Sequence, residues 1–180
     1  MKETKINYIF AEKIEVMVFE DWINNIIGKG LLCKEYTDKL VQAHSKLKIM
    51  DIVLDANGVS WLPEMDSKGY PLPYDTILRE FKSYINGNYI AEFKNEQGGS
   101  YTSSLYCCYS ESDIVDVTST LAVFLGCSGT KIQVRENSVT HLYIDKNCDV
   151  SVFCPNSSHV YLDFCFYLTV RILGSAHLVI

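Results

Sequence analysis

Short runs of alternating apolar and polar residues recur every 18 residues in the last third of the chain. His141, His159 and His177 begin three successive rows of this repeat, and an apolar residue follows each of them. Further along the rows, apolar residues occupy the same columns, as in Ile132, Val150 and Leu168 and in Val134, Val152 and Val170. Alternation with a period of two is typical of β-strands that bury one face, so each row predicts two short strands.

The 18-residue repeat predicts a stack of β coils over residues 105–180. Turn-forming residues lie between the strands, as at 126–129 and 155–158. In a two-sided β-solenoid, each coil buries its apolar residues between two sheets and pairs with the coils above and below it. An antiparallel meander or sandwich is the alternative, because two antiparallel strands of half that length would give the same period.

Residues 1–104 have a different pattern, which predicts a mixed α/β domain. Apolar residues at helical spacing, with capping residues nearby, predict helices near 20–28, 34–47 and 75–86. Two β-rich runs joined by a glycine-containing loop predict a hairpin over 88–109, at the junction with the repeat. The expected fold class is therefore α+β, with a mixed α/β domain over 1–104 followed by an all-β repeat domain over 105–180.

Charge and composition argue against two classes of partner. The net charge of −6 arises in residues 1–119, which contain 12 basic and 18 acidic residues, and no basic stripe suits a nucleic acid. No apolar run reaches the roughly 18 residues of a membrane-spanning helix, so no membrane partner is expected.

The first residues lack the apolar core of a signal peptide. We therefore expect a cytoplasmic protein, or a component of an assembled virion, with its seven cysteines reduced. The excess of Lys over Arg, together with many Asn, Ile and Tyr residues, indicates a bacterial or phage origin.

The main candidate site is a ladder of His, Tyr and Asp residues at outward positions of the repeat. The stretches HLYID and HVYLD place the same three side-chain types on the outer face of consecutive coils, about 4.8 Å apart. Such a face suits a sugar ring or a protein partner. The predicted binding residues are His141, Tyr143, Asp145, His159, Tyr161, Asp163 and His177.

No catalytic residue, metal ligand or cofactor is predicted. The chain contains no C-x-x-C pair, no phosphate-binding glycine loop, no G-x-S-x-G and no H-E-x-x-H sequence. Cys107 and Cys108 are neighbours in a predicted strand, where successive side chains point to opposite faces. One thiol is therefore expected inside and the other outside.

Two known families have coils of similar length. The repeat resembles the left-handed β-helix of hexapeptide-repeat acyltransferases, and this resemblance implies an acyltransferase with a histidine as general base. It departs from that family in one of the three aliphatic columns, which here holds Ser138, Asn156 and Gly174. The repeat is also similar in length to calcium-binding β-rolls, but it lacks their Gly-Gly-x-Gly-x-Asp turns, so no calcium is inferred.

The sequence favours a non-enzymatic binding or structural-assembly module that interacts through a face and an edge of the β-repeat. The alternatives are a hexapeptide-type acyltransferase and a small-ligand-binding protein with its pocket between the helices and the solenoid. An uncovered strand edge promotes association, and the last strand ends in Leu178 and Ile180. We therefore expect a homo-oligomer formed through this edge, with a protein or a carbohydrate as a further partner.

Overall fold

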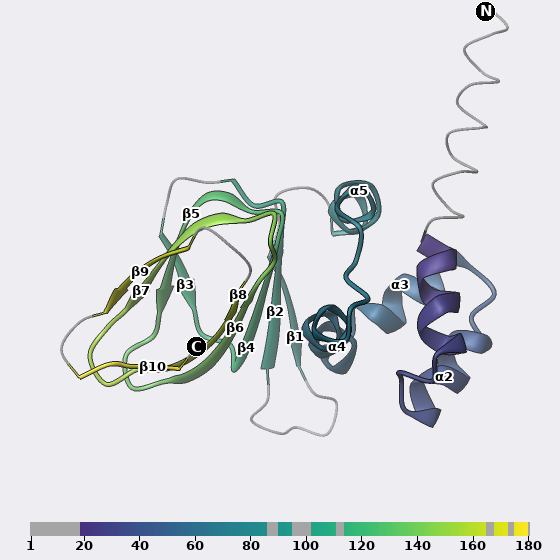
Figure 1. The fold of residues 1–180 in the computed structure, drawn as a ribbon, viewed down its shortest axis with the longest axis horizontal. Coiled ribbons are helices and arrows are strands. Elements are labelled where there is room, and N and C mark those ends of the chain that lie inside the picture. The colour runs from purple at the N-terminus through teal and green to yellow at the C-terminus, as the bar shows by residue number, and fades with distance from the viewer. Residues whose placement is uncertain are drawn as a thin grey trace, which may run out of the picture.

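The computed structural model describes residues 19–85, 90–94, 102–110, 114–164, 168–172 and 175–179. Figure 1 shows a β-solenoid built from two sheets and a group of helices beside it, with α4 and α5 nearest to strands β1 and β2. The predicted α+β fold with a C-terminal β-solenoid is confirmed.

Successive strands of the solenoid alternate between the two sheets. Sheet A has the order β1 (Ile90–Lys94), β2 (Thr102–Cys107), β4 (Leu121–Leu125), β6 (Val139–Ile144), β8 (His159–Phe164) and β10 (His177–Val179). Sheet B has the order β3 (Ile114–Val117), β5 (Ser128–Val134), β7 (Asp149–Cys154) and β9 (Leu168–Ile172). Every neighbouring pair is parallel except β1 and β2, so the antiparallel meander is wrong and the strands form about three solenoid turns.

The antiparallel pair β1 and β2 corresponds to the hairpin predicted over 88–109. On its other side, β2 pairs in parallel with β4, so this strand is also the first member of the solenoid in sheet A. The predicted boundary between residues 104 and 105 therefore falls inside a strand that both parts of the chain share.

The offset between paired residues is not constant along sheet A. Leu121 pairs with His141 and His141 with Tyr161, which are offsets of 20 residues, whereas His159 pairs with His177 at the predicted 18. Side chains alternate with a period of two, so an offset that changes by two keeps every side chain on its own face. The predicted inward columns are therefore correct, but the predicted pairing of His141 with His159 is wrong.

Two equivalent turns are related by the same 20-residue offset. Asn137 and Ser157 both adopt a left-handed backbone, with φ of 56° and 60°. The hydroxyl of the next residue, Ser138 or Ser158, donates to the carbonyl at the start of the same turn, at 2.5 and 2.7 Å. These local bonds stabilise the turns that return the chain from sheet B to sheet A.

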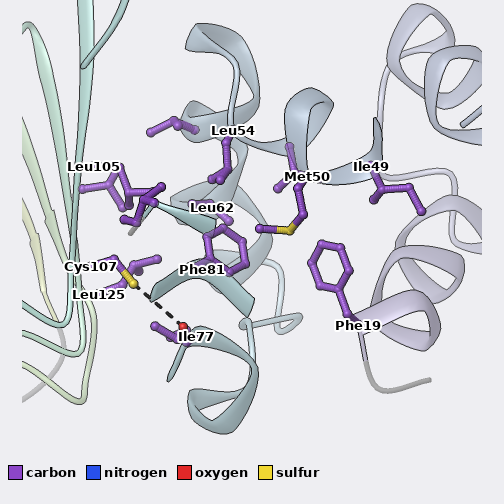
Figure 2. Close-up of a cluster of buried hydrophobic side chains, with 14 of the residues drawn as sticks. Phe19, Ile49, Met50, Leu54, Leu62, Ile77, Phe81, Leu105, Cys107 and Leu125 are labelled. Atoms are coloured by element: carbon purple, nitrogen blue, oxygen red, sulfur yellow. Dashed lines mark hydrogen bonds between the residues drawn. The ribbon is translucent and has the colours of Figure 1, made fainter. Parts of the chain in front are cut away.

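The chain has two apolar cores, one on each side of sheet A. The first lies between the sheets, where the ring of Tyr106 stacks on that of Phe124 at 4.4 Å and the inward residues of the later strands continue the core. The second lies between the outer face of sheet A and the helices (Figure 2). It contains the outward strand residues Leu105, Cys107, Leu121, Val123 and Leu125 together with helical residues such as Phe19, Met50, Leu62, Ile77 and Phe81.

The helical part differs from its prediction in two places. Residues 19–28 are helical, and the predicted segment 75–86 corresponds to α5 (Tyr74–Thr76), the π-helix η1 (Ile77–Phe81) and α6 (Lys82–Tyr84). The prediction of a single helix over 34–47 is wrong, because α2 (Lys34–Val41) ends at Val41 and a new helix, α3 (Lys46–Val53), begins at Lys46. The Ser45 hydroxyl is the N-cap of α3. Helix α4 (Ala56–Ser67) was not predicted, because Gly58 and Pro63 are poor helix formers.

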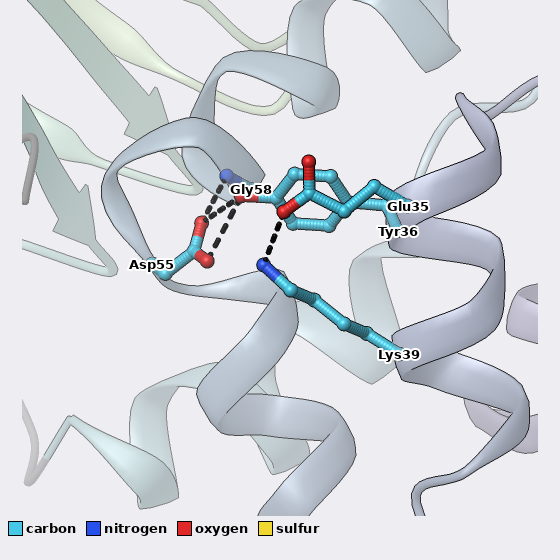
Figure 3. Close-up of polar contacts among 5 residues, drawn as sticks. All are labelled: Glu35, Tyr36, Lys39, Asp55 and Gly58. Carbon is cyan, nitrogen blue, oxygen red and sulfur yellow. Dashed lines mark hydrogen bonds and ion pairs between the residues drawn. The ribbon is translucent and has the colours of Figure 1, made fainter.

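Asp55 fixes the start of α4 and joins it to α2 (Figure 3). Its carboxylate accepts hydrogen bonds from the backbone N–H of Gly58 at 2.6 Å and from the phenol of Tyr36 at 2.8 Å. Burial of the phenol and its bond to Asp55 raise the pKa of Tyr36. The absence of a side chain at Gly58 lets α4 approach the last carbonyl groups of α3 closely. Three helices are thereby held in one fixed layer.

Candidate binding site

The helices cover only part of the outer face of sheet A. Outward residues of β2 and β4 are buried beneath them, whereas most outward residues of β6, β8 and β10 are exposed. We call this second group the exposed face; among the described side chains it consists of Val139, His141, His159, Tyr161, His177 and Val179. Four of the seven predicted binding residues therefore lie together on one exposed surface.

The exposed face contains two ring stacks. His141 stacks on Tyr161 with ring centroids 4.5 Å apart, and His159 stacks on His177 at 4.8 Å. Both pairs follow the strand register, because the stacked residues are direct neighbours on adjacent coils. Stacked rings turn their faces toward each other and their edges toward solvent, so a ligand meets mostly ring edges on this surface.

Tyr143 and Asp145 were predicted to be exposed, and both are buried. Tyr143 is 8% exposed because helix α4 lies over it, and its phenol donates to the carboxylate of Asp66 at 2.5 Å. Asp145 follows the end of β6 and accepts hydrogen bonds from the backbone N–H of Gly126 at 3.1 Å and from the amide of Asn147. The first residue joins the helices to the solenoid, and the second closes a turn.

The remaining predicted residues are only partly described. Asp163 pairs with Tyr143 in the strand register, but its side chain lies outside the described residues. Leu178 is half-buried against the core between the sheets, and Ile180 lies outside the described residues.

A pocket of about 360 Å³ opens where the helical layer ends and the exposed face begins. Three elements line it: α4 contributes Ser60, Pro63 and Glu64, β4 contributes Leu121, and β6 contributes His141, Leu142 and Tyr143. The small-ligand alternative expects a pocket between the helices and the solenoid, but the sequence could not identify its lining residues, because one wall belongs to the unpredicted helix α4.

His141 is one of the residues that line this pocket. Tyr161 covers one face of its ring from the following coil. On the preceding coil, the register neighbour of His141 is Leu121, which has no ring and also lines the pocket. The His141–Tyr161 stack therefore ends at His141, beside the pocket.

The polar groups of the pocket come mainly from α4. One carboxylate oxygen of Glu64 forms an ion pair with Lys68 at 2.6 Å, and both side chains are substantially exposed. The Ser60 hydroxyl donates to the carbonyl of Asn57 at 2.5 Å, which leaves its oxygen able to accept. The pocket thus combines hydrogen-bonding groups with a local charge balance.

Another hollow, of about 370 Å³, lies on the outer face of sheet B. It is lined by Ile114, Lys131, Ile132, Gln133, Ser151, Val152 and Phe153, all from strands of that sheet. No helix in the described part of the chain contributes to its lining, and we use it below as a reference surface.

The two adjacent thiols differ from their prediction. Cys107 and Cys108 both belong to the core beneath the helices, because a φ of 51° at Cys108 turns its side chain away from the strand alternation. A hydrogen bond from the Cys107 thiol, together with the charge of Lys82, lowers the pKa of Cys108 to about 7. The Cys107 thiol also lies 3.9 Å from the carbonyl of Ile77 (Figure 2). Sequence spacing gives no signal for a positive φ at a non-glycine residue.

Neither a metal site nor a membrane span emerges from the described residues. Within them, no three His, Cys, Asp or Glu side chains are grouped so that they could hold a metal ion. Their helices are also too short or too polar to cross a bilayer. Comparison of the chain with protein families, curated proteins and solved structures found no match.

Proposed function

We propose that this chain is a non-enzymatic binding module, and that the pocket between α4 and β6 is its ligand site. The observation that carries the proposal is the pocket itself, where His141 of β6, held in a stack with Tyr161, lies opposite residues of helix α4. Pockets lined by apolar surface with a few polar groups are the usual ligand sites of proteins.

The walls of this pocket are fixed before any ligand arrives. On the solenoid side, His141 is held by its stack with Tyr161. On the helical side, the Tyr143–Asp66 hydrogen bond and the Asp55 cap restrain the two ends of α4. A preformed site loses little conformational entropy on binding, which favours affinity.

The test is a screen of small neutral, acidic and basic compounds by ligand-observed NMR. We expect at least one compound to bind the wild-type protein and to lose binding in His141→Ala. Lys131→Ala, in the hollow on sheet B, is the control and leaves binding unchanged. If no compound binds, or if His141→Ala binds as the wild type does, the proposal is wrong.

A second candidate function is self-assembly through β10. This strand is an edge of sheet A among the described strands, and Val179 is 52% exposed there. An unpaired strand edge offers backbone N–H and C=O groups to another chain, most simply a second copy related by a two-fold axis. Light scattering tests this: we expect a dimer in the wild type and a monomer in Leu178→Lys. A wild-type monomer at high micromolar concentration would contradict it.

The acyltransferase alternative makes a different prediction. An enzyme of that type binds acetyl-coenzyme A, so calorimetric titration with this compound gives heat of binding only if the alternative is correct. A bacterial or phage origin and a cytoplasmic or virion location stay predictions from composition.

A further inference from the structure

We infer that the pocket between α4 and β6 binds one neutral pyranose ring, stacked on the imidazole of His141. This inference rests on the proposed function and adds the chemical class of the ligand. Three features of the pocket carry it: the shape of its walls, the kind of polar groups it contains and its balanced charge.

The walls suit a ring with two different faces. The His141 imidazole is flat, and Leu121 and Pro63 add aliphatic surface around the same space. A pyranose has C–H groups on the faces of its ring and hydroxyl groups at its edge. C–H groups pack against an aromatic face and against aliphatic side chains, so a sugar ring can lie against His141 with its edge toward α4.

The polar groups suit hydroxyls. The Glu64 carboxylate accepts hydrogen bonds, and so can the Ser60 oxygen, whose proton is bound to Asn57. The Lys68 ammonium, which is paired with Glu64 beside the pocket, donates them. A sugar hydroxyl both donates and accepts, so it can bind to any of these groups. A flat hydrocarbon ring in the same place would shield these polar groups from water without replacing their hydrogen bonds, and that is unfavourable.

The local charge argues for a neutral ligand. Glu64 and Lys68 already form an ion pair at 2.6 Å. An anionic ligand would compete with Glu64 for the Lys68 ammonium, and a cationic ligand would compete with Lys68 for the carboxylate. A neutral polyol can join both groups without breaking the pair. The volume of about 360 Å³ lies at the lower end of roughly 300–1,000 Å³ for ligand pockets, which fits a single sugar ring.

The experiment is saturation-transfer NMR on the full chain with glucose, galactose, mannose and N-acetylglucosamine as separate probes. We expect ring C–H signals from at least one of these sugars. His141→Ala is expected to weaken that binding roughly tenfold, because the stacking surface is lost. His141→Phe keeps a flat face and retains binding within a few-fold. His177→Ala is the matched control, since it removes an equally stacked and exposed imidazole outside the pocket.

The outcomes separate this inference from the proposed function. If no sugar gives a signal while other compounds bind in a His141-dependent manner, the pyranose is wrong and the binding module stands. If a sugar binds but His177→Ala removes it and His141→Ala does not, the inference is wrong about the site. If neither sugars nor any other compound binds, both proposals fail.

Discussion

Truncation of Tyr143 and of Tyr161 to alanine is expected to have very different effects on stability. Both tyrosines occupy outward positions on adjacent strands of sheet A. Tyr143 lies beneath α4 and is 8% exposed, whereas Tyr161 belongs to the exposed face and is 41% exposed. At about 25 cal/mol per Å², the roughly 150–250 Å² that a buried aromatic side chain contributes corresponds to about 4–6 kcal/mol. Alanine retains only a small part of this burial.

The hydrogen bond to Asp66 adds to the cost for Tyr143. Bonds to charged groups contribute about 1.5–3 kcal/mol, and the lower end applies here because Asp66 is half-exposed. The burial that alanine retains offsets about as much as this bond contributes, so we expect Tyr143→Ala to cost about 4–6 kcal/mol of a total stability of about 5–15 kcal/mol. For Tyr161→Ala we expect about 2 kcal/mol, from the buried part of the ring and its stack on His141.

Urea and thermal unfolding followed by circular dichroism measure both losses. At about 2–4 °C per kcal/mol for a chain of this size, Tm falls by about 10–20 °C for Tyr143→Ala and by about 4–8 °C for Tyr161→Ala. Tyr143→Phe separates the contributions, because it removes only the hydroxyl and should cost about 1.5 kcal/mol. Equal losses for the two alanine variants would refute the placement of α4 over Tyr143.

Three further changes test the core, the helical layer and the thiols. Val152→Asp buries an unpaired carboxylate between the sheets and should prevent soluble expression, whereas Ser151→Asp on the outer surface should be tolerated. Equal Tm values for the two variants would contradict the assignment of Val152 to an inward position. Gly58→Ala places a methyl group against the last carbonyls of α3 and should cost about 1–3 kcal/mol in urea unfolding, so an unchanged midpoint would argue against this close contact. In a Cys33→Ser background, alkylation of Cys108 by iodoacetamide should rise with pH around a midpoint of about 7, because the thiolate is the reactive form; a midpoint near 9 would show that the pKa is not lowered.

The solenoid could be predicted from sequence because its cores depend only on which face a side chain takes. Inward residues such as Ile132 and Val152 keep their alternation whatever the exact offset between coils. The offset itself was not predictable in this way, because 18 and 20 residues have the same parity and give the same inward pattern. The left-handed residues Asn137 and Ser157 repeat at the offset of 20, and neither is a glycine.

The candidate site could be predicted only in part. The repeat identified His141 and Tyr161 as outward residues, and the structure places them in one stack beside the pocket. Burial of Tyr143 depends on α4. Helix propensity does not predict this helix, because it contains Gly58 and Pro63, and long-range packing stabilises it instead. Local pattern thus gives the orientation of a side chain, while exposure depends on what another segment of the chain places over it.

The border between the covered and exposed parts of sheet A links ligand binding to the docking of the helices. Glu64 belongs to α4 and His141 to β6. A ligand that contacts both residues can therefore bind only while the helices are packed against sheet A. By mass action, such a ligand at 100 times its Kd would strengthen that docking by about 2.7 kcal/mol. This energy is larger than the roughly 1.5 kcal/mol of the Tyr143–Asp66 hydrogen bond, so the ligand acts as an additional, removable connection between the two parts of the protein. A protein built in this way reports its ligand through the protection of α4 against hydrogen exchange, even when the solenoid itself does not change.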